Sequence, residues 1–289
     1  MWFALALAAA LLTSILPIIN KRLLADTPVP TVAWGVNALS LPLLGVFAVL
    51  LLPLPAVDSV FWLGVLGSAV LNLVATLVST QALKLGEASL VTPLLTFNPA
   101  FTLAIATIAL GEVPSWHGVA GVVVILWGSY VLSLSEAEHG WWRPLAALVT
   151  RPAMVLALAA SFIWGLTPIT EKLAMQHSDP SNPPLVAFAS TALMALFLVP
   201  MMLRSTTQPL RYLQTHRRGF LLAAGIAGVA PVFGFTAIGL GFVGYVTAVF
   251  KVSTVFSVIW AAMLLKESAT RDRLVGATLM VLGTVVVAL

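Results

Sequence analysis

Long apolar runs of about 20 residues fill most of the chain, and short polar or proline-containing segments separate them. Residues 119–134 and 153–162 are apolar almost all the way around a helix, so they lack the alternation of a barrel strand. In a bilayer the backbone must bond within its own segment or within a closed barrel, and a spanning helix needs ~20 apolar residues. The pattern therefore predicts an all-α membrane protein.

We expect ten transmembrane helices, with proline-rich or glycine-rich connections between most of them. The expected helices are 2–22, 31–52, 59–83, 89–110, 115–135, 153–173, 184–203, 217–239, 244–265 and 271–289. The connection at 136–152 is expected to be an interfacial linker. It divides the chain into a first five-helix unit at 1–135 and a second at 153–289.

The two units resemble each other at an offset of 155 positions, and the matches include glycines and a glutamate as well as common apolar residues. The most specific pairs are Gly86 with Gly241, Gly121 with Gly276, Gly128 with Gly283, and Glu112 with Glu267. A shorter match joins Pro17 and Lys21 to Pro168 and Lys172. Because each unit holds an odd number of helices, the sequence predicts that the two units are inverted repeats.

Composition and charge agree with this picture. The chain is 60% hydrophobic and 8% charged, whereas soluble domains carry roughly 25% charged residues. Apart from Lys172 and Lys251, the Lys and Arg residues, 12 of the 14 in the chain, lie in or beside the connections after helices 1, 3, 5, 7 and 9. The positive-inside rule then places both termini outside a cytoplasmic (inner) membrane. Because the first apolar run precedes any charge, we expect it to be retained and not cleaved as a signal peptide.

These features resemble the drug/metabolite transporter superfamily, in particular its ten-helix EamA-type members. The residues that carry the resemblance are 82–86, 91–93 and 111–112, with their counterparts 237–241, 246–247 and 266–267. The resemblance implies two inverted five-helix halves around a cavity, and transport of a small, often amino-acid-like metabolite, frequently as export. Multidrug relatives use a carboxylate in the middle of the first helix. We expect no mid-membrane carboxylate in helix 1 or helix 6 here.

Lys251, in helix 9, is the most specific candidate for substrate binding. A charged Lys at the centre of a bilayer costs on the order of 2.5–3.5 kcal/mol, so such a residue usually faces a cavity or a partner. It is expected to bind a substrate carboxylate or phosphate. The alternative is that its ammonium extends to the membrane interface.

Helix 4 provides further candidates in Thr92, Thr96 and Asn98, next to two prolines that free backbone carbonyls. Helix 9 has no prolines at the matching positions, so only helix 4 is expected to be kinked there. Asn72 in helix 3 and Trp164 in helix 6 are further lining candidates. The alternative for all of them is helix packing.

Four charges at helix ends are candidates for gating. In an inverted repeat, Lys21 and Glu267 fall on one membrane face, and Lys172 and Glu112 on the other. Two ion pairs could therefore latch opposite openings. The alternative is that these charges only mark wet helix ends, where an exposed pair contributes ~0–1 kcal/mol.

The function that follows is secondary transport of small polar metabolites, with a small molecule and the bilayer as partners and no nucleic acid. A flippase or carrier for a lipid-linked or phosphorylated metabolite is the alternative. A membrane enzyme would need clustered carboxylates or histidines at one depth, which we do not find. No cofactor is expected. No metal is expected either, because the chain has no Cys and its 4 His residues lie in separate connections. Residues 239–244 match GxGxxG without a Rossmann context.

Overall fold

The structure is a computed structural model that describes residues 1–86, 88–134, 151–265 and 271–289, and nearly all of these residues are helical. The expected linker at 136–152 falls almost entirely outside the described residues. The helices are α1 (Trp2–Thr13), α2 (Leu16–Leu23), α3 (Val29–Leu50), α4 (Ser59–Leu85), α5 (Ala88–Leu95), α6 (Asn98–Ala109), α7 (Trp116–Leu134), α9 (Pro152–Gln176), α10 (Pro183–Ser205), α11 (Pro209–Thr215), α12 (Arg217–Leu240), α13 (Val243–Phe250), α14 (Ser253–Leu265) and α15 (Arg271–Ala288).

Among the described residues, 8 helical segments are long and apolar enough to cross a membrane. Two shorter apolar helices, Trp116–Leu132 and Leu274–Ala288, fall on the ranges expected for helices 5 and 10. The predicted all-α membrane fold is therefore confirmed. The number of ten spans stays a prediction.

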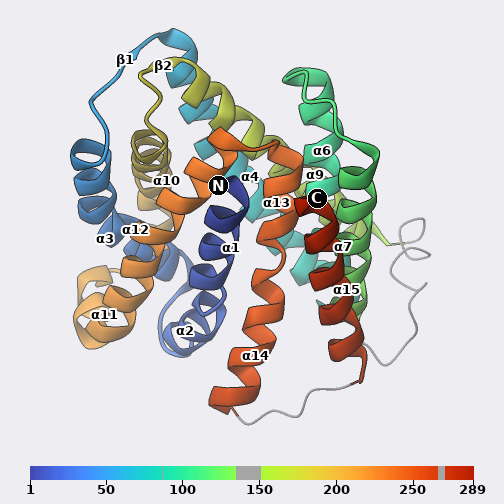
Figure 1. Cartoon of the computed structure of the whole chain (residues 1–289). Helices are drawn as coiled ribbons and strands as arrows, with labels where there is room; N and C mark the ends of the chain where they lie inside the picture. The colour runs from blue at the N-terminus through green and yellow to red at the C-terminus, as the bar shows by residue number, and fades with distance from the viewer. Residues whose placement is uncertain (87, 135–150, 266–270) are drawn as a thin grey trace.

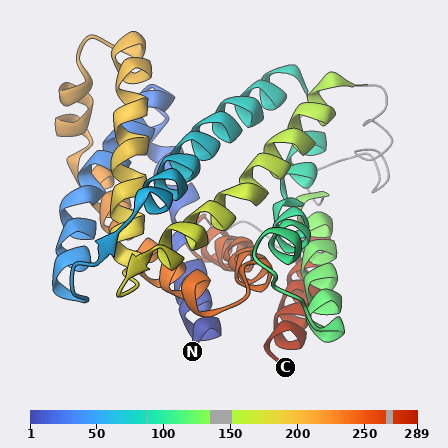
Figure 2. The same ribbon diagram turned by 90° about the horizontal axis from the view of Figure 1, so that it is seen from above.

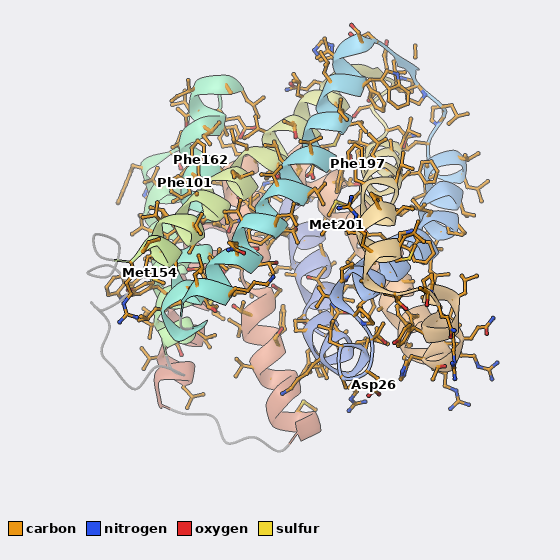
Figure 3. The ribbon with its side chains drawn as sticks, turned by 180° about the vertical axis from the view of Figure 1, so that it is seen from behind. Asp26, Phe101, Met154, Phe162, Phe197 and Met201 are labelled. Carbon is orange, nitrogen blue, oxygen red and sulfur yellow. The ribbon has the colours of Figure 1, made fainter. Side chains whose placement is uncertain are left out.

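The helices pack in pairs that join the two ends of the sequence. Helix α4 lies along α9, and α7 lies along α15 (Figures 1 and 2). Helix α3 packs on α10, and α12 contacts α1 and α3. Where α6 meets α9, the rings of Phe101 and Phe162 pack edge to face with centroids 5.4 Å apart (Figure 3). Every one of these contacts joins a segment of residues 1–134 to a segment of residues 151–289.

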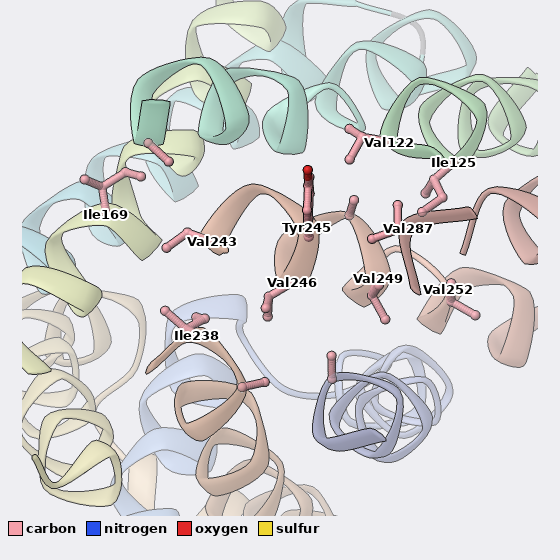
Figure 4. Close-up of a cluster of buried hydrophobic side chains, with 14 of the residues drawn as sticks. Val122, Ile125, Ile169, Ile238, Val243, Tyr245, Val246, Val249, Val252 and Val287 are labelled. Atoms are coloured by element: carbon pink, nitrogen blue, oxygen red, sulfur yellow. The ribbon is translucent and has the colours of Figure 1, made fainter. Parts of the chain in front are cut away.

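The largest apolar cluster surrounds α13 (Figure 4). Val243, Val246 and Val249 on this helix are fully buried and contact side chains from both ends of the chain, such as Val122 of α7 and Ile169 of α9. A short helix enclosed on all sides is held in place by its neighbours, so α13 provides a fixed support for the residues at its two ends.

Three spans are interrupted, which the sequence predicted for only one of them. The first span breaks at Ser14 and Ile15, just before Pro17, and the fourth breaks at Thr96 and Phe97, just before Pro99. A proline nitrogen cannot donate to the carbonyl four residues earlier, so a break at that point is expected.

The ninth span also breaks, between α13 and α14, which corrects the expectation of a kink in helix 4 only. No proline is present there. The N–H groups of Lys251 and Val252 bond to carbonyls three residues earlier, at 3.0 Å each, so the helix tightens for one turn. The hydroxyl of Thr254 donates to the carbonyl of Lys251 at 2.6 Å. The backbone N–H of Thr254 donates to the same carbonyl at 3.0 Å, so this carbonyl accepts two bonds within the tightened turn.

Two connections are tied together at one end of the bundle. Strand β1 (Ala56–Val57) pairs antiparallel with β2 (Ser178–Asp179), next to the starts of α4 and α10 (Figure 1). His177 Nδ1 lies 2.7 Å from Asp58 Oδ2, and the same aspartate accepts from the N–H groups of Val60 and Phe61. The hydrogen bond with His177 and then the bond from Phe61 hold the pKa of Asp58 below its ordinary value.

Candidate functional site

A cavity of about 570 Å³ lies in the interior of the bundle. Its walls come from the broken first, fourth and ninth spans and from α3, α4, α9, α10 and α12. Most of the lining surface is apolar, although 12 of the 22 lining residues carry a polar side-chain group. These groups are Thr13, Asn37, Asn72, Asn98, Trp164, Thr167, Glu171, Thr191, Thr247, Lys251, Ser253 and Thr254. A mostly apolar cavity with a few convergent polar groups is typical of a small-molecule site.

Four of the six predicted substrate-binding residues line this cavity: Lys251, Asn98, Asn72 and Trp164. They come from the ninth, fourth, third and sixth spans, so the folded chain brings together residues that are far apart in sequence.

The other two predicted residues do not line it. Thr96 is buried and donates to the carbonyl of Pro93 at 2.6 Å, and Thr92 is exposed on another side of α5. Because α5 ends at Leu95, residues on either side of the break no longer follow one helical register. The sequence predicts one unbroken helix over 89–110. A single register places Thr92, Thr96 and Asn98 on related faces, which the break does not preserve.

Lys251 occupies the break between α13 and α14. It is partly buried, and no described carboxylate lies within 4.0 Å of its ammonium group. Breaks of this kind expose backbone groups as well as side chains toward a cavity. Lys251 is therefore a partly buried basic residue that remains available to a ligand.

Asn98 begins α6 immediately after the other break. Its side-chain oxygen is buried and has no hydrogen-bond partner among the described residues. An amide has both donors and acceptors, and buried polar atoms are normally satisfied. In a residue that lines the cavity, an unused acceptor points to a ligand or to water.

Glu171 also lines the cavity, and the sequence reasoning missed it. We had expected no mid-membrane carboxylate in helix 6, because that helix was expected to end at residue 173. Helix α9 continues to Gln176, which leaves Glu171 inside the span with 8% exposure. Its Oε1 accepts a hydrogen bond of 2.9 Å from Ser68 on α4. The available signal was the charged pair of residues 171–172, because neighbouring positions on a helix face different directions and the two side chains therefore have different surroundings.

Several repeat-related positions meet at this cavity. Asn72 and Ala227 are related by the 155-residue offset, as are Asn98 and Ser253, and all four line it. At the shorter offset that relates Pro17 to Pro168, Thr13 corresponds to Trp164, and both line it as well. Matching positions from both parts of the chain therefore surround one space.

Lys172 and Glu112, one of the two predicted gating pairs, form an ion pair. Lys172 also donates to the carbonyl of Gly241 at 2.7 Å, and Glu112 Oε2 accepts from the N–H of Val243 at 2.7 Å. We call these four residues the latch. Gly111, with φ of 68°, allows the chain to turn after α6 so that Glu112 reaches this position.

The latch joins the ends of four spans. Glu112 follows α6, Lys172 belongs to α9, Gly241 directly follows α12, and Val243 is the first residue of α13. The side chains of Lys172 and Glu112 are only 13% and 9% exposed. Such a pair is better shielded than the exposed helix-end charges that the alternative interpretation required.

The second predicted gating pair cannot be described in the same way. Lys21 is exposed at the end of α2, and Glu267 lies outside the described residues. For metal binding, the part of the chain that the structure describes contains no group of three or more His, Cys, Asp or Glu residues that could hold an ion.

Comparisons with known proteins agree with this architecture. The model of the EamA-like transporter family matches residues 1–134 and 151–289. The chain is 38% identical over 69 residues to the uncharacterized protein MJ1333.1 of Methanocaldococcus jannaschii, a match that covers 24% of this chain and spans only about half (50%) of that relative. A protein of known crystal structure superposes with a TM-score of 0.79, at 16% identity and over 100% of this chain and 98% of the other; this likeness concerns the fold alone.

The family match covers most of the chain and confirms the resemblance that the sequence motifs indicated. The chain therefore belongs to the EamA-like transporter family, whose members are membrane transporters and not enzymes.

Proposed function

We propose that the protein is a secondary transporter, working as an exporter, for small polar metabolites such as amino acids. It works by alternating access across the cytoplasmic membrane, with residues 1–135 and 153–289 as inverted halves. The observation that carries the proposal is the cavity itself. Repeat-related positions from both halves surround it, and broken helices supply its polar groups. Broken helices at a repeat interface are where secondary transporters commonly bind their substrates.

The latch is proposed to close one entrance to this cavity. Its members belong to both halves: Glu112 to the first, and Lys172, Gly241 and Val243 to the second. A rocking motion of one half against the other would separate them. A matching pair between Lys21 and Glu267 would close the opposite entrance, because the repeat relates these two residues to Lys172 and Glu112. Only one pair needs to be formed at a time.

The positive-inside rule gives the proposal a direction in the membrane. The latch lies at the ends of spans 4 and 6 and between spans 8 and 9, whereas the basic residues cluster at the opposite ends. The latch is therefore placed on the outer face, with both termini. A closed outer latch leaves the cavity to be loaded from the cytoplasm, as export requires.

Transport by purified protein in liposomes tests this function. We would measure uptake and release of labelled amino acids and organic anions, with and without a pH gradient. Lys251→Ala should weaken transport of anionic substrates most, because the cation in the cavity is lost. Lys84→Ala, which removes an exposed cation near the end of α4, is the matched control and should leave transport unchanged. Absence of movement for every class of small polar solute would contradict the proposal.

A lipid-linked or phosphorylated substrate is the second candidate, and Lys251 is the observation that favours it. A buried ammonium without a described carboxylate partner suits a phosphate as well as a carboxylate. In the same liposomes, movement of a short-chain fluorescent phospholipid or of a sugar phosphate, in the absence of amino-acid transport, would decide for this function.

A further inference from the structure

The cavity is lined by a lysine and a glutamate that form no ion pair with each other among the described residues. Lys251 lies in the ninth span and Glu171 in the sixth, and both line the same space. Among the described residues, no ion pair within 4.0 Å joins them, and neither has another charged partner. The neighbouring Lys172 does not serve Glu171, because its ammonium is bound to Glu112 and Gly241 on another side of α9.

Unpaired charges inside a protein are costly, so their presence needs a reason. An isolated ionised group loses its hydration when it is buried, and natural proteins normally pair it. Glu171 receives only the hydroxyl of Ser68, although a carboxylate accepts several hydrogen bonds. Lys251 has three donors that no described side chain uses. Each group thus has free capacity directed at the cavity.

The backbone places the two residues at different distances from the latch. Glu171 precedes Lys172 of the latch, so it lies at the latch end of the cavity. Val243 is also part of the latch, and the 8-residue α13 runs from it to Lys251. At ~1.5 Å per residue, Lys251 lies ~12 Å along that helix from the latch. A ligand that touches both groups must therefore extend along the cavity.

The wall around these charges is suited to uncharged parts of a ligand. Trp164 and Phe235 provide apolar faces, and Asn98 has a side-chain oxygen without a partner. The cavity therefore offers a cationic point, an anionic point, and a mixed surface that suits the portion of a molecule that joins two charged ends.

We propose that the cavity selects dipolar substrates, which carry a cationic and an anionic group on one molecule. Lys251 binds the anionic group, and Glu171, supported by Ser68, binds the cationic group nearer the latch. This inference rests on the proposed transport function and narrows its substrate class. It also gives Glu171 a role in specificity, which the resemblance to the family did not assign to this residue.

Binding to the purified, detergent-solubilised full chain tests the proposal without transport. The probes are 6-aminohexanoate, hexanoate and hexylamine, which share one carbon chain and differ only in their charged ends. The wild type should bind the dipolar probe at least about tenfold more tightly than either single-charge probe, since each charged hydrogen bond adds about that factor. Linear amino acids from glycine to 8-aminooctanoate then give the preferred charge separation, which should exceed that of glycine.

Two variants show which residue binds the ammonium end and which binds the carboxylate end of 6-aminohexanoate. Glu171→Gln should lower the affinity for 6-aminohexanoate to that of hexanoate and leave hexanoate unaffected. Lys251→Met should lower it to that of hexylamine and leave hexylamine unaffected. Asp179→Asn and Lys84→Met remove exposed charges outside the cavity and serve as matched controls that should change nothing. Circular dichroism and size-exclusion profiles establish that each variant is folded.

The results that would contradict the dipolar site differ from those that would contradict the transport function. Equal binding of all three probes by the wild type would overturn the dipolar proposal, as would a uniform loss of all three in folded Glu171→Gln protein. Transport of other solutes could then still be observed. Conversely, selective binding of 6-aminohexanoate without its movement in liposomes would support the dipolar site and contradict the transport function.

Discussion

Gly128 of α7 lies directly against the backbone of Gly276 of α15. A Cβ atom at Gly128 would be 2.7 Å from the carbonyl oxygen of Gly276, and one at Gly276 would be 2.8 Å from that of Gly128. Gly121 and Gly283 have the same relationship, at 2.9 and 2.8 Å. The repeat relates Gly121 to Gly276 and Gly128 to Gly283, so each glycine contacts the counterpart of the other. Such reciprocity is what a two-fold relationship produces.

This close approach predicts a sharp response to the smallest side chain. Gly128→Ala should lower the stability of the folded protein by about 1–3 kcal/mol, because backbone on both helices must move. Thermal unfolding in detergent, followed by tryptophan fluorescence, measures the change. The control is Gly225→Ala in α12, where no atom lies within 4 Å of the new Cβ and helix propensity favours alanine. Equal behaviour of the two variants would show that α7 and α15 do not pack this closely.

The ion pair of the latch predicts how transport responds when the charges at 172 and 112 are reversed singly and together. Lys172→Glu and Glu112→Lys should each abolish most transport, since two like charges would then face each other in a largely shielded place. The double swap should restore transport in part. Recovery stays incomplete because a glutamate at 172 cannot donate to the carbonyl of Gly241 and a lysine at 112 cannot accept from Val243. If the double variant is no better than the single ones, the pairing has no role in the transport cycle.

The hydrogen bond between Asp58 and His177, beside strands β1 and β2, predicts that the stability of the fold depends on pH. Asp58 has its pKa lowered by the hydrogen bond with His177, so the ionised form is favoured in the folded state. A group with a depressed pKa stabilises the fold above its ordinary pKa of 3.8 and loses this effect as the pH falls through the lower folded value. Asp58→Asn keeps an acceptor for the start of α4. Because the amide cannot ionise, this variant should unfold at a lower temperature than the wild type at pH 6, and the difference should shrink as the pH falls below 3.8.

The buried hydrogen bonds of Asn182, at the start of α10, predict that its substitution lowers the stability of the fold. It is fully buried, its Nδ2 donates to the carbonyl of Ala48 at 3.0 Å, and its Oδ1 accepts from the N–H of Leu185 at 3.0 Å. Asn182→Ala leaves these buried groups unpaired, which should lower the free energy of unfolding by about 1–3 kcal/mol. Ser181→Ala, at the exposed neighbouring position, should be neutral in the same denaturation measurement. A neutral Asn182→Ala would mean that water replaces both bonds.

Most of the fold could be predicted from the sequence, because a backbone that spans a bilayer can only be a helix or part of a closed barrel. Apolar length and breakers located the helices. The paired glycines indicated a repeat, but not that the same glycines bring α7 and α15 into close contact. Breaks caused by Pro17 and Pro99 follow from backbone chemistry. The break at Lys251 does not, because no proline lies there, and the tightened turn with its hydrogen bond from the Thr254 hydroxyl to the Lys251 carbonyl has no sequence signature of its own.

The candidate site was less accessible to sequence reasoning. Lys251 and Asn98 stood out as polar residues in apolar segments, and both line the cavity. Thr92 and Thr96 were grouped with them only because one unbroken helix was assumed. Glu171 was overlooked because helix 6 was expected to end at residue 173, whereas α9 ends at Gln176. The earlier end makes Glu171 a terminal residue instead of a residue within the span. Errors of this size are small along the chain and large for the orientation of a side chain.

The most direct test of alternating access is to lock the latch. The chain has no cysteine, so Lys172→Cys with Glu112→Cys places a unique pair of thiols across the two proposed halves. A short bismaleimide should join them and stop transport in liposomes, while each single-cysteine variant treated in the same way retains the rate that it had before treatment. Full transport activity in protein shown by mass spectrometry to be crosslinked between residues 112 and 172 would contradict a cycle that opens this face.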